Sequence, residues 1–326
     1  MNRHAVQLIS RGAITKIGNM LYDYGNSVWL ASMGTIGKTV LGIYQISELV
    51  TGILVNPFGG VISDRFSRRK ILMTTDLVCG LLCLAISFIR NDCWMIAALI
   101  FANIVQVIAF VLVAFLPKEE AKVQEKKQFT VKDIFSDIKE GLDYIWHQKD
   151  IFFLLLVASG VNFFFAAFEF LLPFSNRLYG VNGAYATILT LGAIGSILGA
   201  LVANKIASSM KTLLFLLIMA GGGVFMMGLP LPPYFSFSGN LVCEFFVTIF
   251  DIHVFTQVQT KVEDDYLGRV LSTIYTLAVL FMPIAKGLMT WLPSVQVESF
   301  LLIGAGVILF SLFAQLVAKQ FQSKEQ

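Results

Sequence analysis

Three acidic residues lie inside long apolar stretches, where an ionised side chain is costly. Asp23 lies about three helical turns into the stretch 12–34, and Glu244 and Asp251 lie about two turns apart in the stretch 236–256. That spacing puts Glu244 and Asp251 on one face of a helix, where they can hold a cationic substrate or a proton. We expect Asp23 to bind and release a proton. In the structural alternative, Asn26 and a neighbouring helix satisfy the carboxylate of Asp23, and the other two acids lie in a polar seam between helices.

The composition predicts the elements that must position these acids. The chain has 326 residues, 56% of them hydrophobic and 14% charged, with a mean hydropathy of +0.75, far from the average of soluble proteins. We expect an all-α polytopic membrane protein with about ten transmembrane helices, because period-two alternation is absent. The stretches long and apolar enough to cross a bilayer are 12–34, 39–62, 71–89, 93–116, 151–174, 184–203, 212–230, 236–256, 270–292 and 297–317.

The basic residues indicate how these helices are oriented. An even number of spans puts both termini on one side, and placing them in the cytoplasm leaves nineteen of the 24 Lys and Arg residues there. We therefore expect a multi-pass protein of the plasma membrane with both termini in the cytoplasm. The net charge of +3 is distributed by this topology, so no nucleic-acid partner is expected. The exceptions are Lys38, Arg90 and Arg177, which then lie outside, and Lys16 and Lys286, which lie within spans.

Other features of the spans are interpreted as structural. Glu48 and Glu169 lie nearer the outer ends of their stretches, and the long side chain of Lys286 can extend outward to water. Small residues at regular spacing predict close contact with a neighbouring helix rather than a ligand site. The glycines with this spacing are Gly192, Gly195 and Gly199.

The cationic segment "GGVISDRFSRRK" after the second span contains a motif. It resembles the pattern G-x-x-x-D-R-x-G-R-R/K that the major facilitator superfamily carries between its second and third helices, with Ser67 in place of the second glycine. The matching residues are Gly60, Asp64, Arg65, Arg68 and Arg69. A second segment, "TQVQTKVEDDYLGRVLS", is similar to the loop between helices ten and eleven of bacterial drug-efflux members, with Glu263 where proline is common.

The resemblance implies a gate on the cytoplasmic side. Asp64 would face the positive N-terminal end of the helix that starts near Arg269. Arg65 and Arg68 would pair with acids of the same half, and Asp76 is a further candidate partner of these arginines. Such ion pairs can stabilise one arrangement of the helices relative to another, as a gate requires.

A polar segment divides the chain into two unequal parts. Residues 1–117 hold four predicted spans, residues 118–149 form a cytoplasmic linker with an amphipathic helix, and residues 150–326 hold six spans. The stretch "IFANIVQVIAFVLVAFLPKEE" resembles the start of the family's fourth helix running into the end of its sixth. The resemblance therefore implies a two-bundle architecture with an incomplete N-terminal bundle that has lost two helices. A genuine ten-helix variant is the alternative.

The function implied is secondary active transport, with proton-coupled efflux of small lipophilic or drug-like compounds. Protons, a small-molecule substrate and the lipid bilayer are the expected partners, and the oligomeric state stays open. The alternatives are a transport-inactive remnant that acts as an interaction partner, or an importer of another small solute. We expect no enzyme, no cofactor and no metal, because the sequence has no catalytic motif and no cluster with metal-ligand spacing.

Overall fold

The computed structural model describes residues 20–65, 77–99 apart from 79, 83, 86–87 and 90–91, 139–262 apart from 141, and 264–323. In these residues the regular structure is helical, in agreement with the all-α class expected from the sequence. Residues 20–32 form a helix, which ends at a turn where Gly34 has a φ of 70°, in the left-handed region that favours glycine.

Helices that follow this turn make up the rest of the described fold. Their bounds are α2 (Gly34–Arg65), α6 (Lys149–Leu171), the 3₁₀ turn η1 (Leu172–Phe174), α7 (Ser175–Tyr179), α8 (Ala184–Ala203), α9 (Met210–Met227), α10 (Pro233–Lys261), α11 (Asp264–Val279), α12 (Met282–Trp291) and α13 (Glu298–Ser323).

Six helical stretches in the described residues are long and apolar enough to cross a membrane. They agree in position with the last six predicted spans, because a hydrocarbon environment requires the same apolar run that the sequence displays. Their bounds are Lys149–Tyr179, Ala184–Ala203, Met210–Met227, Pro233–Lys261, Thr273–Trp291 and Glu298–Lys319. Of the earlier predicted spans, 39–62 lies within α2, whereas 71–89 and 93–116 lie largely outside the described residues.

The stretch expected as one helix over 270–292 is divided into α11 and α12. A turn at Leu280 and Phe281 separates them, and α12 begins at Met282 and Pro283. Proline has no backbone N–H, so the bond from residue 283 back to the carbonyl of Val279 cannot form. The chain resumes its helix with Ala285, whose N–H donates to the Phe281 carbonyl.

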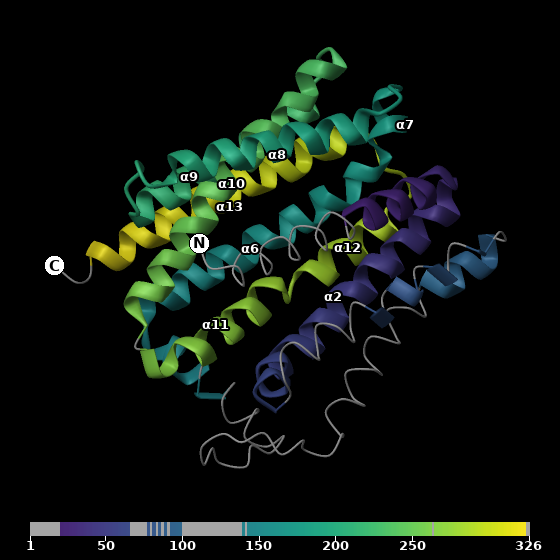
Figure 1. The fold of residues 1–326 in the computed structure, drawn as a ribbon. Helices are drawn as coiled ribbons and strands as arrows, with labels where there is room; N and C mark the ends of the chain where they lie inside the picture. The colour runs from purple at the N-terminus through teal and green to yellow at the C-terminus, as the bar shows by residue number, and fades with distance from the viewer. Residues whose placement is uncertain are drawn as a thin grey trace.

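The helices pack in two groups that share α6. Helix α10 packs against α8 and α9, and α9 packs against α13, forming one layer of the C-terminal part (Figure 1). Helix α6 contacts α13 on one side and α11 and α12 on the other. Helix α2, from the N-terminal part of the chain, packs along α11 and α12. Residues far apart in sequence therefore meet where α2, α6 and α12 come together.

The predicted contact of the glycine-bearing helix is confirmed. Helix α8 packs on α10, and a Cβ at Gly199 would lie 2.5 Å from the carbonyl oxygen of Phe245. A Cβ at Gly195 would come closer still to the carbonyl oxygen of Leu241. The absence of side chains on this face lets the two helix backbones approach each other.

The end of the predicted linker also packs against the bundle. Residues 142–147 are helical, and Ile145 is buried in a cluster with Ile151, Val258 and Val270. Trp146, the next residue, is instead exposed.

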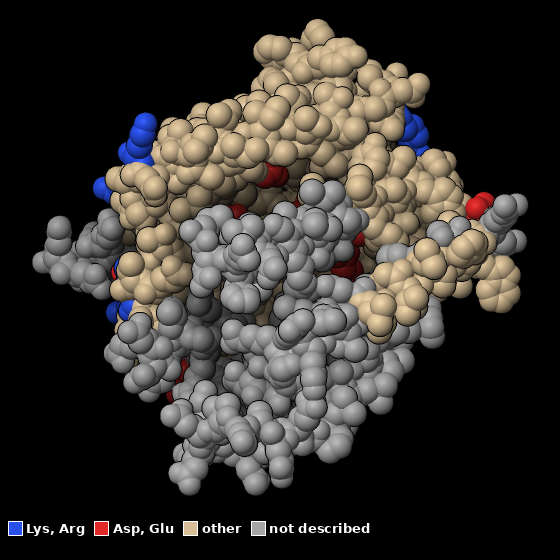
Figure 2. Space-filling view, viewed as in Figure 1, with Lys and Arg blue, Asp and Glu red and all other residues tan. Residues whose placement is uncertain are grey.

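Basic side chains of the described residues gather toward the two ends of the molecule (Figure 2), as expected for helices whose middle parts lie in lipid.

Candidate functional site

A buried lysine forms the centre of the candidate site. The Nζ atom of Lys286 on α12 lies 3.4 Å from Oε2 of Glu169 on α6. The Lys286 side chain is 9% exposed and the Glu169 side chain 53% exposed. Because an unpaired charge in an apolar bundle is costly, this ion pair joins α12 to α6.

Two further acids approach the pair from the N-terminal part of the chain. Glu48 on α2 lies within electrostatic reach of Lys286, Glu169 and Asp23. The hydroxyl of Tyr44, one helical turn before Glu48, donates to Oδ1 of Asp23 at 3.2 Å. We call these five residues the Lys286 cluster: Asp23, Tyr44, Glu48, Glu169 and Lys286.

Aromatic rings lie beside the cluster. Tyr24, the neighbour of Asp23, stacks on Tyr185 at the start of α8, with 5.1 Å between ring centroids and 14° between planes. Tyr185 in turn lies within electrostatic reach of Glu169 and Asp23. The cluster thus has three carboxylates, one ammonium group and polarised aromatic faces, a set that suits a lipophilic cation.

The end of the cluster nearest the α2 start is closed by direct helix contact. A Cβ at Gly42 would overlap the side chain of Thr290, so α2 and α12 touch at this point. Lys38 is buried, and its Nζ donates to the carbonyl oxygen of Leu292 just after α12. In the orientation expected from the basic residues, this closed end faces outward.

The two acids predicted on α10 extend the cluster in the other direction. Glu244 accepts a hydrogen bond from the Ser196 hydroxyl at 3.1 Å and lies within electrostatic reach of Glu169. Asp251 lies within reach of Glu244 and is exposed. Acidic side chains of the described residues are visible inside a hollow of the surface (Figure 2). Carboxylates therefore follow one another from Asp23, through Glu169 and Glu244, to Asp251.

The polar seam proposed as the alternative for α10 is present beside Glu244. The Asn240 side chain donates to the Ile188 carbonyl at 2.8 Å, one turn from the bond between Glu244 and Ser196. These contacts join α8 and α10. Glu244 therefore has a structural partner, whereas Asp251 lies on an exposed face.

Residues of the cationic motif lie mostly beyond what the structure describes. The backbones of Gly60, Asp64 and Arg65 belong to α2, so this helix continues past the span end expected at residue 62. The positions 68, 69 and 76, and all side chains of the motif, lie outside the described residues. Arg269 lies in α11, which begins at Asp264 and packs against α2.

Sequence analysis missed the central members of the cluster. Lys286 was interpreted as a structural residue whose side chain can extend outward to water, but in the structure it is buried and its ammonium group contacts Glu169. Glu48 and Glu169 were interpreted as structural residues of the outer helix ends. A signal was available: an acid and a base each inside an apolar span favour each other as partners.

The part of the chain that the structure describes contains no candidate metal site. No group of three or more His, Cys, Asp and Glu side chains there is arranged to hold an ion.

The comparison with protein families finds a match over the middle and later parts of the chain. The family model of the Major Facilitator Superfamily matches residues 94–286, which is more than half of the chain. Among curated proteins, none matches this sequence.

Proposed function

The chain belongs to the major facilitator superfamily and is a multi-pass membrane transporter, and from this premise we propose that it exports small lipophilic compounds in exchange for protons. The proposal includes membership of the drug-efflux-like branch, supported by the resemblance of residues 256–272 to its loop. It places the protein in the plasma membrane with cytoplasmic termini, supported by the distribution of Lys and Arg.

The single observation that carries the proposal is the Lys286 cluster. It draws Asp23 and Glu48 from the N-terminal part and Glu169 and Lys286 from the C-terminal part to one place. Family transporters of two bundles alternate access by moving one bundle against the other. A cluster that spans both parts changes its pairing in that motion, and a change of pairing changes how strongly a carboxylate holds its proton.

Asp23 is assigned the proton-coupling role. It receives only the Tyr44 hydroxyl in the described contacts, at 3.2 Å, whereas Glu169 is held by a full ammonium charge. Protonation of Asp23 removes one of three negative charges from the cluster and weakens its hold on a cation. Export then follows because proton entry and cation release favour the same conformation.

Glu244 and Asp251 are assigned to the substrate path. They continue the run of carboxylates away from the closed contact of Gly42 with Thr290. A cationic compound entering from the cytoplasm meets exposed Asp251 before it reaches the cluster. The acids thereby raise the local concentration of cations along the route.

The cytoplasmic gate is assigned to Gly60, Asp64, Arg65, Arg68 and Arg69, with Asp76 and Arg269 as partners. Its support is the family motif together with the packing of α2 on α11, the helices that carry Asp64 and Arg269. We further assign four spans to residues 1–117 and six to 150–326, with two helices of the N-terminal bundle lost.

Transport in inverted membrane vesicles tests the proposal. Vesicles with the full chain, the Asp23→Asn variant and the Asp143→Asn control are compared at equal abundance for uptake of a fluorescent lipophilic cation. Asp143 is exposed on the helical end of the linker and serves as a matched acid. We expect uptake that requires the proton gradient and that Asp23→Asn abolishes while the control retains it.

Other outcomes would favour the alternatives. No uptake above empty vesicles for any of several lipophilic cations, from protein shown to be inserted, would favour a transport-inactive chain. Gradient-driven movement in the opposite direction would favour an importer. Equal loss in both variants would remove Asp23 from the coupling role.

A further inference from the structure

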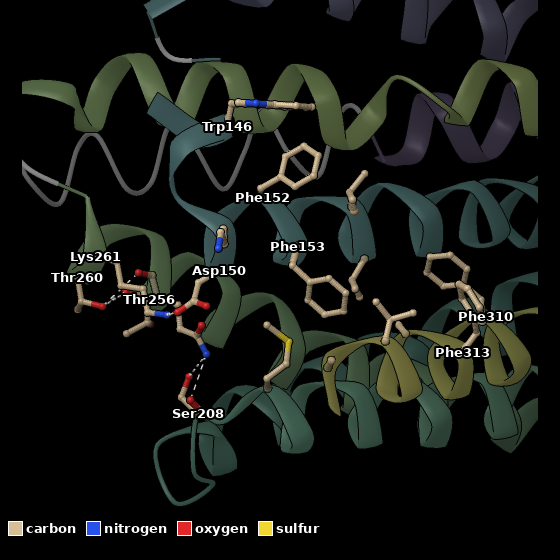
Figure 3. A pocket seen from close by; sticks show the side chains of 18 residues that line it. Trp146, Asp150, Phe152, Phe153, Ser208, Thr256, Thr260, Lys261, Phe310 and Phe313 are labelled. Carbon is tan, nitrogen blue, oxygen red and sulfur yellow. Dashed lines mark hydrogen bonds and ion pairs between the residues drawn. The ribbon is translucent and has the colours of Figure 1, made fainter. Parts of the chain in front are cut away.

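A cavity of about 1000 Å³ lies between the start of α6, the end of α10 and the second half of α13 (Figure 3). It is distant from the Lys286 cluster, because Asp150 and Glu169 lie near opposite ends of α6, about 28 Å apart along a helix. The described residues that line it come from the end of the linker and from the C-terminal part. The transport cycle proposed above makes no use of it.

The cavity is amphipathic along its length. Hydrocarbon and aromatic side chains line one part, including Phe153 and Val157 on α6 and Phe310 and Ala314 on α13. Charged and polar side chains line the other part, where α6 begins and α10 ends. An occupant that satisfies both parts has a polar head and an apolar tail.

Among the lining side chains that the structure describes, those at the polar end carry a surplus of positive charge. Nζ of Lys261 lies 2.9 Å from Oδ2 of Asp150, and Lys149 adds a second ammonium group to the lining. The hydroxyls of Thr256 and Thr260 donate to backbone carbonyls within α10, so they are already occupied. The charged donors that line this end are the two lysines. The two cations and one anion among the described lining residues favour an anionic head group over a zwitterionic one.

The apolar part opens sideways rather than into the bundle. Leu156 on α6 is 50% exposed and Phe313 on α13 is 62% exposed, although both line the cavity. In a membrane protein such apolar exposure faces lipid chains. Trp146 lies at the polar rim, 69% exposed and edge-on to Phe152, as aromatic residues at a membrane interface do.

We propose that this cavity binds one anionic phospholipid of the cytoplasmic leaflet. Its phosphate lies between Lys149 and Lys261, and an acyl chain enters through the opening between Leu156 and Phe313 and lies along Phe153 and Phe310. The cytoplasmic leaflet is the one that carries anionic lipids, and the expected orientation of the helices puts this end of α6 there. The bound lipid joins the ends of α6, α10 and α13.

Native mass spectrometry of the full chain in detergent tests the proposal. Phosphatidylglycerol and phosphatidylcholine with identical acyl chains are titrated into the wild type, a Lys149→Gln/Lys261→Gln variant and a Lys139→Gln/Lys205→Gln control of equal charge. Lys139 and Lys205 are exposed and do not line the cavity. We expect a single phosphatidylglycerol to bind about tenfold more tightly than phosphatidylcholine, and this preference to disappear in the cavity variant but not in the control.

A second measurement locates the site even if the double variant folds poorly. Phosphatidylglycerol brominated on its upper acyl chain, present at a low fraction in phosphatidylcholine, should quench tryptophan fluorescence of the wild type more than brominated phosphatidylcholine does. The difference should vanish in Trp146→Phe. Equal quenching by both lipids, or equal binding by the cavity variant and its control, would overturn the proposal whether or not the protein transports anything.

Discussion

Lys286 on α12 is held by Glu169 on α6, with 3.4 Å between Nζ and Oε2, although both residues lie in apolar helices. The same ammonium group lies within electrostatic reach of Glu48 on α2. The ammonium group of Lys286 therefore interacts with acids from both parts of the chain. Any motion that parts α2 from α12 must redistribute its interactions.

Removing this cation should damage the protein more than removing the whole ion pair. In Lys286→Gln, Glu169 and Glu48 lose their counter-ion, and we expect the folded state to lose on the order of 1–2 kcal/mol, reduced from a fully buried pair because Glu169 is half-exposed. The double variant Lys286→Gln/Glu169→Gln should regain part of that loss. Thermal unfolding in detergent measures both, and a double variant less stable than Lys286→Gln would contradict the pairing.

A side chain at Gly42 should hold the two parts of the chain apart at their closed end. A Cβ there overlaps Thr290, so Gly42→Val should separate α2 from α12 and expose Lys38, which is now buried. The measurement is the alkylation rate of a Lys38→Cys variant in a background whose native cysteines are replaced by alanine. We expect at least a severalfold faster rate with Gly42→Val. The matched control is Gly25→Val, because a Cβ at Gly25 meets nothing within 4 Å.

The contact of α8 with α10 should tolerate no added volume. Gly199→Ala places a methyl group 2.5 Å from the carbonyl oxygen of Phe245, and a backbone atom cannot turn away as a flexible side chain can. We expect a loss of about 1–3 kcal/mol in the free energy of unfolding, as for other overpacked interiors. Gly222→Ala on α9 is the control, since its Cβ meets nothing within 4 Å and alanine favours the helix. Equal melting temperatures for the two variants would refute the close approach.

Sequence reasoning succeeded where a single stretch contains its own signal. The last six spans were predicted because each needs a continuous apolar run, and the glycines of α8 predicted a close helix contact that the structure contains. Helix α2 extends beyond both ends of the predicted span 39–62, and α11 begins before the predicted start at residue 270. A helix can continue past the hydrocarbon into residues that are no longer apolar, so hydropathy does not mark its end.

The partners of buried charges could not be predicted in the same way. Lys286 and Glu169 are far apart in the chain, and only the packing of α12 against α6 brings them together. Sequence shows that each charge needs a partner but offers several. The amphipathic cavity could not be predicted from the sequence for the same reason, because it depends on how α6 and α13 pack.

Pro283 gives the last prediction, because it marks the break between α11 and α12. Restoring the N–H with Pro283→Ala allows a bond to the Val279 carbonyl and favours one continuous helix across residues 264–291. That helix could no longer turn its outer part, which carries Lys286, independently of its inner part. We expect gradient-driven uptake in vesicles to fall severalfold while the melting temperature stays the same or rises. Pro233→Ala at the first turn of α10, where proline replaces no helical hydrogen bond, should leave uptake unchanged. Full uptake by Pro283→Ala would mean that transport does not require a separate α12.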